Sequence, residues 1–255
     1  MRRTIIFVCT IGLLFATAGC GAGQVFGPTI TPSPTYTPLP SKTPTSELPV
    51  ELTTLFEGLS LTYFEGFEKE PALNFILSVE PVIIDGTLEL PSPTQLPENS
   101  LTFGLPIHKS EGIVIDFKFS APVQSAYSII AIKSGIPGRD STDFKVFSAT
   151  FTSFDMQINA LEQGEDRLSL QESTDWLKPN TWYRLVLAID ENGKVIFVEW
   201  ERDSATPLVQ SYLFECGESW ANSEWRFEVV NHLVAIDVDN FYTFSFTSIK
   251  ESVQS

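Results

Sequence analysis

The sequence predicts an all-β domain, built from two packed antiparallel sheets, that follows a disordered tether rich in Pro, Thr and Ser. Three observations lead to this prediction. Beyond about residue 50, apolar and polar residues alternate over short runs, which is typical of half-buried strands. No stretch keeps a helical period of 3.6 residues over three turns. The length left after the tether, about 200 residues, suits one β-sandwich.

The chain begins with the features of an export signal. Two arginines precede an apolar run over residues 5–16, and small residues at 17–19 lead to Cys20. The apolar run is shorter than the roughly 20 residues that a membrane-spanning helix needs. We therefore interpret residues 1–19 as a signal peptide that is removed on export.

The end of this segment resembles a bacterial lipoprotein signal, in which small residues precede a cysteine that is diacylated and becomes the first mature residue. Ala18, Gly19 and Cys20 match its last three positions, while Thr17 stands where leucine is usual. The resemblance implies lipid attachment at Cys20 and a place on the extracytoplasmic face of the cell membrane. An ordinary secretory signal cleaved near Ala18 and an uncleaved membrane anchor are the alternatives.

Residues 20–50 are predicted to form an unfolded tether. Most residues between Pro28 and Pro49 are Pro, Thr or Ser. This composition cannot bury enough apolar area to offset the entropy lost on ordering. Frequent proline favours polyproline II, so the tether would extend to about 90 Å at most. That length would carry a folded domain at 51–255 clear of the membrane surface.

Short strands separated by turns are predicted throughout residues 51–255. Gly112–Ala121 and Trp182–Asp190 alternate apolar and polar positions. Asn192-Gly193 tolerates the positive φ of a type I′ turn, so Lys194–Glu201 should return beside the preceding strand. Further alternating runs cover Thr87–Leu90, Leu101–Ile107, Tyr127–Lys133, Lys145–Phe154, Arg167–Gln171, Leu208–Glu215, Trp225–Asn231 and Phe241–Ile249. About a dozen such strands imply two packed antiparallel sheets.

The charge of the chain excludes some partners. The formal net charge is −16. Cleavage of the signal would remove Arg2 and Arg3 and make the charge about −18. The sequence contains no basic patch, so nucleic acid and anionic lipid surfaces would be repelled. We expect the acidity to serve solubility or to accommodate a cation such as Ca²⁺.

Cysteine and histidine usage argues against several kinds of catalytic site. Cys9 lies in the signal and Cys20 would be acylated, which leaves Cys216 as the only free thiol and no intramolecular disulfide. We expect Cys216 to pack in or beside the core. His108 and His232 stand far apart in the sequence, and neither has the spacing of a zinc site or a catalytic triad.

The order of several features along the chain carries a family resemblance. These features are Asp85-Gly86-Thr87-Leu88, the strand Gly112–Phe119, the segment Leu177–Leu185 with the Asn192-Gly193 hairpin, and Ile236–Phe241. Over about residues 55–250 the chain is similar to the concanavalin A-like lectins and glucanases, in particular their laminin-G-like branch. The resemblance implies a jelly-roll sandwich whose N- and C-terminal strands pair. Members bind sugars, cleave glycosides or mediate adhesion, so the fold alone does not give the function.

Glucanases of this superfamily carry two catalytic carboxylates on one strand, in a Glu-x-Asp-x-Glu pattern. The nearest run here is Glu199–Asp203, where alternation would place Glu199, Glu201 and Asp203 on one face with neighbours about 7 Å apart. This spacing permits hydrolysis, but the order of the acids differs and the run follows a tight hairpin. We interpret it as a solvated acidic face and expect no enzyme activity. A glycoside hydrolase is the alternative.

Asp237, Asp239 and Asp85 are the candidate metal ligands. Several laminin-G-like relatives hold Ca²⁺ near such positions, and Ca²⁺ needs six to eight oxygen ligands. Glu65 or Glu68 could join the group if the ends of the chain pair. The sequence supplies candidate side chains but does not show a full coordination shell. The alternative is that these aspartates stabilise turns or lie on an exposed strand edge. We expect no cofactor other than this calcium.

Trp176 and Trp220 are the candidate ligand-binding residues, because sugar rings stack on exposed indoles. Trp176 precedes a loop that contains proline, and Trp220 lies in a polar stretch. The alternative is that each anchors a loop on the sandwich. Trp182, Trp200 and Trp225 lie in alternating strands and are predicted to be core residues.

Together these features predict a surface-anchored lipoprotein with a non-catalytic binding domain. An extracellular or cell-wall glycan is the expected ligand, and the lipid anchor is the expected contact with the membrane. A structural or protein-interaction sandwich without a small-molecule ligand is the second interpretation.

Overall fold

A computed structural model describes residues 47–250, except 70–73, 81, 93–98, 121–126, 136–143, 153–154, 164, 174–176, 203 and 205–207. The export signal, Cys20 and most of the predicted tether therefore lie outside the described residues. Among the residues that are described, no helix is long and apolar enough to cross a membrane.

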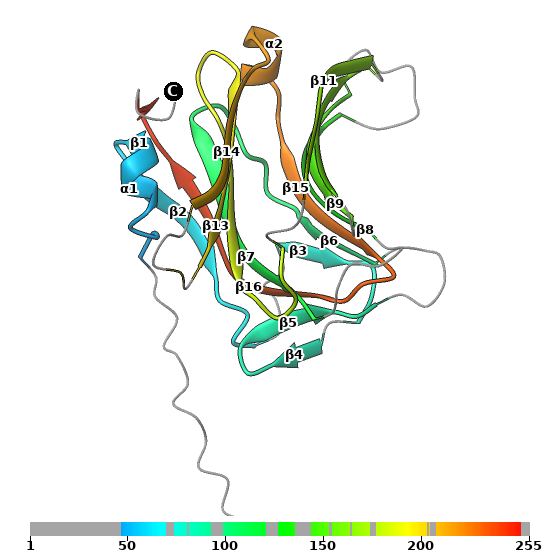
Figure 1. Cartoon of the computed structure of the whole chain (residues 1–255). Coiled ribbons are helices and arrows are strands. Elements are labelled where there is room, and N and C mark those ends of the chain that lie inside the picture. The colour runs from blue at the N-terminus through cyan, green and yellow to red at the C-terminus, as the bar shows by residue number, and fades with distance from the viewer. Residues whose placement is uncertain are drawn as a thin grey trace, which may run out of the picture. The chain divides into compact units, whose positions relative to one another are not determined.

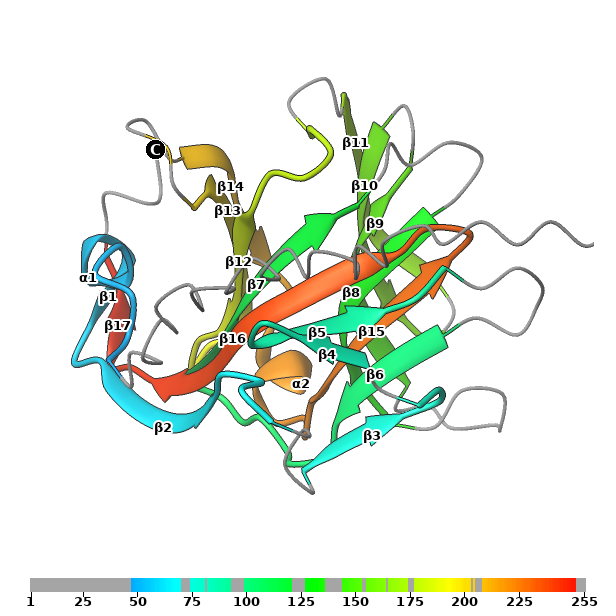
Figure 2. The ribbon, with the colours of Figure 1, turned by 90° about the horizontal axis from the view of Figure 1, so that it is seen from below.

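Two large antiparallel sheets pack against each other as a sandwich, which confirms the predicted fold class (Figures 1 and 2). The seven-stranded sheet has the order β11 (Glu165–Ser173), β10 (Asp155–Glu162), β9 (Lys145–Phe151), β8 (Tyr127–Ser134), β15 (Arg226–His232), β6 (Asn99–Phe103) and β3 (Phe75–Leu77). The eight-stranded sheet has the order β14 (Leu208–Glu215), β13 (Lys194–Glu201), β12 (Tyr183–Ile189), β7 (Glu111–Phe119), β16 (Ile236–Ser245), β5 (Thr87–Leu90) and β4 (Val82–Ile84), with β2 (Ser60–Glu65) paired to β16.

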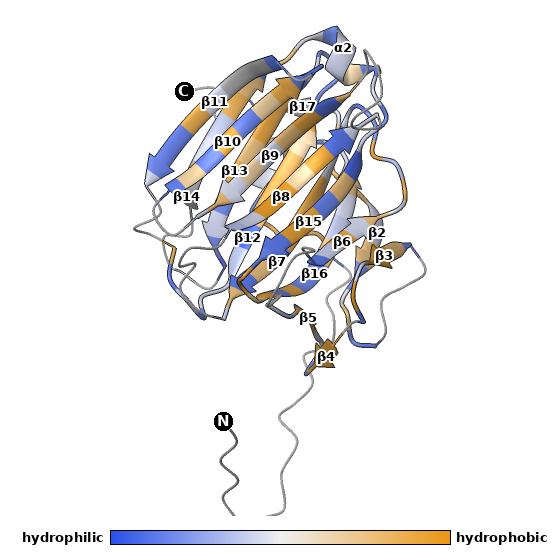
Figure 3. Cartoon of the chain, turned by 90° about the vertical axis from the view of Figure 1, so that its right-hand side faces the viewer, coloured by the Kyte–Doolittle hydropathy of each residue, from blue (hydrophilic) through white to orange (hydrophobic). Residues whose placement is uncertain are grey.

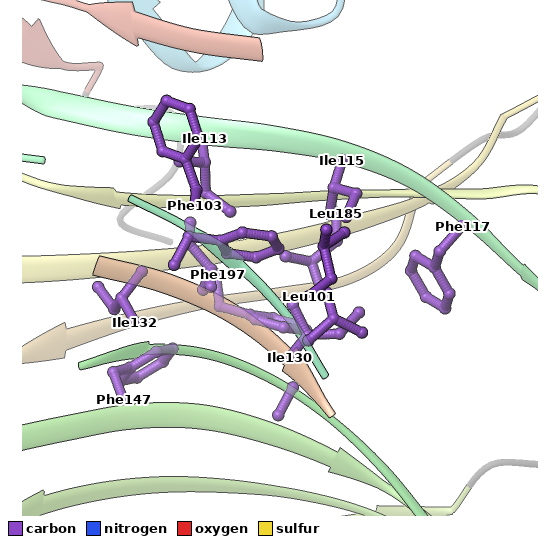
Figure 4. Packing of buried hydrophobic residues seen from close by; sticks show 14 of the residues in the cluster. Leu101, Phe103, Ile113, Ile115, Phe117, Ile130, Ile132, Phe147, Leu185 and Phe197 are labelled. Carbon is purple, nitrogen blue, oxygen red and sulfur yellow. The ribbon is translucent and has the colours of Figure 1, made fainter. Parts of the chain in front are cut away.

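The main core lies between the two sheets and follows the alternation seen in the sequence. On β7 the side chains of Ile113, Ile115 and Phe117 are fully buried in it. They face side chains such as Ile130 and Phe147 of the seven-stranded sheet (Figure 4). Burial of these aliphatic and aromatic groups supplies the main driving force for the sandwich.

A second apolar layer covers the outer face of the eight-stranded sheet. The short helix α1 (Leu52–Leu55) and strand β1 (Phe56–Glu57) lie over Val114, Val186 and Tyr242. Strand β1 pairs with β17 (Ser248–Ile249), and β2 pairs with β16. The predicted pairing of N- and C-terminal strands is therefore confirmed, and it leaves much of the eight-stranded sheet buried on both faces.

The predicted Asn192-Gly193 hairpin joins β12 and β13. The carboxylate of Asp190 accepts hydrogen bonds from the backbone N–H groups of Asn192 at 2.8 Å and Lys194 at 2.7 Å. Gly193 has a φ of +78°, and a Cβ there would lie 1.9 Å from the carbonyl oxygen of Gly217. Only glycine fits this position, because both the φ and the close approach exclude a side chain.

The predicted strand over Lys145–Phe154 extends beyond the end of β9, and β10 was not predicted. Strand β9 ends at Phe151 and β10 starts at Asp155. The two strands are antiparallel, so the chain reverses between these residues. Thr152 closes this turn, because its backbone N–H donates to the carbonyl oxygen of Asp155 at 2.8 Å.

Candidate functional site

The outer face of the seven-stranded sheet is the candidate functional site. Strands β8, β9, β10 and β15 alternate inward residues of the core with outward residues that are largely polar (Figure 3). The outward polar side chains are Tyr127, Lys133, Ser148, Thr150, Asp155, Gln157, Asn159, Arg226, Glu228 and His232. No helix or strand of the described chain packs across them in Figure 3. This face can therefore present hydrogen-bonding groups to a ligand.

A carboxylate with several donors occupies one end of this face. Asp155 accepts hydrogen bonds from the Thr152 hydroxyl and from the side-chain amides of Gln157 and Gln171. These bonds, with that of Thr152 the strongest, hold the pKa of the Asp155 carboxyl below its ordinary value. The acid is thus kept ionised, and it fixes the orientation of two amides on neighbouring strands.

The next outward position continues this polar row. The hydroxyl of Ser169 on β11 donates to the side-chain oxygen of Asn159 on β10 at 3.0 Å. The amide nitrogen of Asn159 has two N–H donors. Polar groups from β10 and β11 therefore form an ordered set of donors and acceptors at this edge of the sheet.

An aromatic pair lies on β8 and β15, at the same end of the strands as Asp155. Tyr127 and His232 are cross-strand neighbours on β8 and β15. Their rings stack with centroids 4.9 Å apart and an interplanar angle of 24°. Both side chains are half-buried, and His232 Nδ1 has no hydrogen-bond partner among the described residues. Toward the opposite end of β8, Lys133 forms an ion pair with Glu228 of β15.

The structure corrects the predicted role of Trp220. The short helix α2 (Glu218–Ala221) turns this indole into the core, where its exposed fraction is 0%. Its ring lies 5.0 Å from that of Trp225, whose Nε1 donates to the Trp220 carbonyl oxygen at 3.1 Å. Trp220 is therefore a loop anchor and cannot serve as an exposed platform. Trp176 lies outside the described residues.

The other three tryptophans divide between core and surface. Trp225 and Trp200 are buried, as predicted. Trp182 is only half-buried, and the cations of Lys118 and Arg202 lie 4.8 Å and 4.7 Å from its ring centroid. The prediction that Trp182 is a core residue was wrong, because it lies on the outer face of the eight-stranded sheet among charged groups.

The candidate calcium ligands do not form one site. Asp237 pairs with Lys118 at 2.9 Å, and Asp239 pairs with Arg202 at 2.9 Å. Asp85 has a φ of +52° in the turn between β4 and β5. Within the described parts of the chain, no three carboxylate, histidine or cysteine side chains are placed to hold a metal ion. The predicted grouping was wrong, and each aspartate serves its own ion pair or turn.

Asp239 belongs to an ion-pair network on the outer face of the eight-stranded sheet. At its centre Asp116, fully buried, accepts bonds from Arg184 Nε at 2.7 Å and Nη2 at 3.0 Å, and from Arg202 Nη1 at 3.0 Å. A bulge with a φ of +37° at Asn240 turns its amide toward the same carboxylate, at 3.2 Å. We call these residues the Asp116 network.

Charge complementarity stabilises both guanidinium groups of the Asp116 network. Burial alone would favour their neutral forms, but the hydrogen bonds and charge of Asp116 raise the pKa of Arg184 and Arg202 above the ordinary value. Arg184 also reaches Glu51 at 3.3 Å. The network therefore holds the N-terminal segment on the sheet and has a structural role.

The acidic run on β13 is not the solvated face that the sequence predicted. Glu199 points between the two sheets, its exposed fraction is 0%, and neither carboxyl oxygen has a hydrogen-bond partner among the described residues. Trp200 points to the opposite, second apolar layer. The prediction failed because both faces of β13 are covered. Asp203 lies outside the described residues.

Cys216 lies where the sequence predicted it. The side chain is half-buried and packs against the main core, next to the end of β14.

The sequence alone did not predict the polar face, because alternation does not reveal which polar stripe remains uncovered. On β10, Asp155, Gln157 and Asn159 alternate with the buried Met156 and Ile158. This alternation was the one feature of the sequence that could have indicated the polar face. Alternation on β7 looks similar, yet its polar stripe includes the buried Asp116.

Comparisons with known proteins support the fold. No protein-family model matches the chain, and no curated protein matches it. The CBM2 module of the evolved Dit protein of Lactobacillus casei BL23 phage J-1 is 8% identical, with a TM-score of 0.56 over 76% of this chain and 98% of that one. Winged bean acidic lectin, complexed with methyl-α-D-galactose, is 14% identical, with a TM-score of 0.52 over 76% and 100%.

An enzyme is similar to the same extent. Crh5 transglycosylase in complex with NAG is 10% identical, with a TM-score of 0.54 over 76% of this chain and 87% of that one. At these identities the likeness establishes the fold alone, which is that of the concanavalin A-like lectins and glucanases. Lectins and enzymes share it, so the function must be argued from the residues of the site.

Proposed function

We propose that this chain is a non-catalytic carbohydrate-binding protein, anchored by lipid at Cys20 to the extracytoplasmic face of the membrane. The observation that carries the proposal is the uncovered polar face of the seven-stranded sheet, with the stacked Tyr127–His232 pair. Amides and carboxylates exchange hydrogen bonds with sugar hydroxyls. Aromatic rings pack against the apolar C–H faces of sugars.

The comparisons are consistent with this class of ligand. One similar structure is a lectin bound to methyl-α-D-galactose, and another is a transglycosylase bound to NAG. A formal charge of −16 favours a neutral glycan, because an anionic polysaccharide would be repelled. We therefore expect an extracellular or cell-wall glycan without carboxylate or sulfate groups.

The arrangement of outward carboxylates supports binding without hydrolysis. On strands β8, β9, β10 and β15 the described outward carboxylates are Asp155 and Glu228. Two strands separate β10 from β15, and Glu228 is also displaced along the strands from the level of Asp155, so the carboxylates are roughly 20 Å apart. Glycoside hydrolysis needs two carboxyl groups about 5–9.5 Å apart. Glu199 points into the core instead.

A protein-interaction domain is the second candidate, and exposed apolar residues favour it. Ile76 on β3 is 61% exposed and Ile84 on β4 is 55% exposed. Both strands end their sheets, and unpaired strand edges can bind an extended peptide. A glycan array on which the chain binds no glycan would favour this candidate over carbohydrate binding.

Replacing Tyr127 by alanine tests the proposed binding face. We expect affinity for the glycan selected on an array to fall about tenfold, because the substitution removes one ring of the stacked pair. Calorimetric titration of the purified chain measures the change. Trp182→Ala is the matched control, since it removes a half-buried ring from the other sheet. Equal losses in the two variants would contradict the assignment of the face.

A further inference from the structure

Glu199 is a buried acid that the proposed binding function does not use. It lies on the inward face of β13, opposite Leu185 of β12, and is completely shielded from solvent. Both carboxyl oxygens lack a hydrogen-bond partner among the described residues. A buried carboxylate without a partner is strongly destabilising. Burial therefore raises the pKa of the Glu199 carboxyl well above its ordinary value, so the folded protein favours the protonated form.

Among the described residues, no positively charged group offsets the burial of Glu199. Its electrostatic field reaches Tyr212 on β14 and Tyr183 on β12. Burial, with the charge and hydrogen bond of Glu172 next in importance, raises the pKa of Tyr212 to about 12. Burial also raises the pKa of Tyr183, and the charge of Glu201 on β13 raises it further. The described titratable groups around Glu199 are therefore Tyr183, Glu201 and Tyr212 of the eight-stranded sheet. Glu172 of the seven-stranded sheet completes the set.

Glu199 lies toward one edge of the inter-sheet space. Strand β14 ends the eight-stranded sheet and β11 ends the seven-stranded sheet. The inward-facing residues Leu170, Glu172, Glu201 and Tyr212 are half-buried here, whereas Leu185 on β12, one strand further from the edge than Glu201, is fully buried. A small separation of β14 from β11 would bring water to Glu199.

We propose that Glu199 is a pH-sensitive latch, which keeps the β11–β14 edge closed when it is protonated and loosens that edge when it loses its proton to water. In the closed state the neutral carboxyl fits an apolar setting. The ionised form has no hydrogen-bond partner among the described residues in the closed state and gains hydration only when the edge opens. The latch does not depend on a bound glycan.

The direction of the pH effect follows from proton linkage. The closed state holds the Glu199 proton more tightly than an open state in which the carboxyl is hydrated. Closure is therefore fully favoured below the ordinary pKa of a glutamate, about 4.3. It weakens as pH rises from there through the raised pKa of the closed state, by at most a factor of ten per pH unit.

Hydrogen exchange read by mass spectrometry tests the latch in the full chain. Wild type and Glu199→Gln are compared at pH 5 and pH 8, so that the intrinsic exchange rate cancels at each pH. We expect the ratio of exchange in wild type to that in the variant to rise at least about tenfold between these pH values in β11, β13 and β14. Strands β8 and β15 should show little change.

Glu201→Gln is the matched control, because it neutralises a half-buried acid on the same strand. It should retain the pH dependence of wild type. A ratio that stays constant between pH 5 and pH 8 would overturn the latch, as would an equal rise in every strand. If Glu199→Gln fails to fold, Glu199→Leu offers an apolar replacement of similar size for the same comparison.

Discussion

Replacing Asp116 by alanine is expected to lower the free energy of unfolding by about 3–5 kcal/mol, the largest loss that we expect from a single change to a polar side chain. Asp116 is fully buried and accepts hydrogen bonds from Arg184, Arg202 and Asn240. Without it, two largely buried guanidinium groups lose their central counter-charge. Arg202 would keep Asp239, and Arg184 would keep the more distant Glu51.

Thermal unfolding followed by circular dichroism measures this effect. For a domain of this size the expected loss lowers the midpoint by roughly 6–20 °C. Asp237→Ala is the matched control, because its partner Lys118 is partly solvated, and its cost should stay below about 1 kcal/mol. Similar midpoints for the two variants would show that the Asp116 network does not stabilise the sheet.

Replacing Cys20 by serine is expected to abolish membrane attachment. The prediction rests on residues 1–20, which lie outside the described structure. Each buried methylene of an acyl chain contributes about 0.8 kcal/mol, and two chains give stable anchoring where one does not. In a bacterial host, labelled palmitate should enter the wild-type chain and be absent from Cys20→Ser. Fractionation should move the variant out of the membrane fraction.

Cys216→Ser is the control for this experiment. Cys216 packs against the core, so its replacement should leave both labelling and fractionation unchanged. Label that persists in Cys20→Ser, or a wild-type chain without label, would contradict the lipoprotein assignment and favour ordinary secretion.

Much of the fold could be predicted because it depends on local patterns. Alternation along Gly112–Ala121 predicted β7. Asn192-Gly193 predicted a hairpin, in which Gly193 has a φ and a close contact that only glycine tolerates. The resemblance also gave the pairing of the chain ends, which β2 and β16 confirm. These features depend on residues close together in the sequence, or on their order along the chain.

The site could be predicted less well because exposure depends on what covers each face. The helix α2 turns Trp220 inward beside Trp225, although its sequence neighbours are polar. Strand β13 is covered on both faces, so Glu199 is buried where alternation suggested solvent. The acids Asp237 and Asp239 have basic partners on β7 and just after β13, which sequence spacing could not pair with them.

Hydroxyl-radical footprinting, with and without a saturating glycan chosen from an array, tests the proposed binding face most directly. The oxidation rates of Tyr127 and His232 should fall when the glycan binds, because both rings lie on the outer face of the seven-stranded sheet. The rates of Trp182 and Ile84, which lie on the eight-stranded sheet or beside it, should stay the same. Protection of Trp182 or Ile84, with none at Tyr127 and His232, would contradict the account.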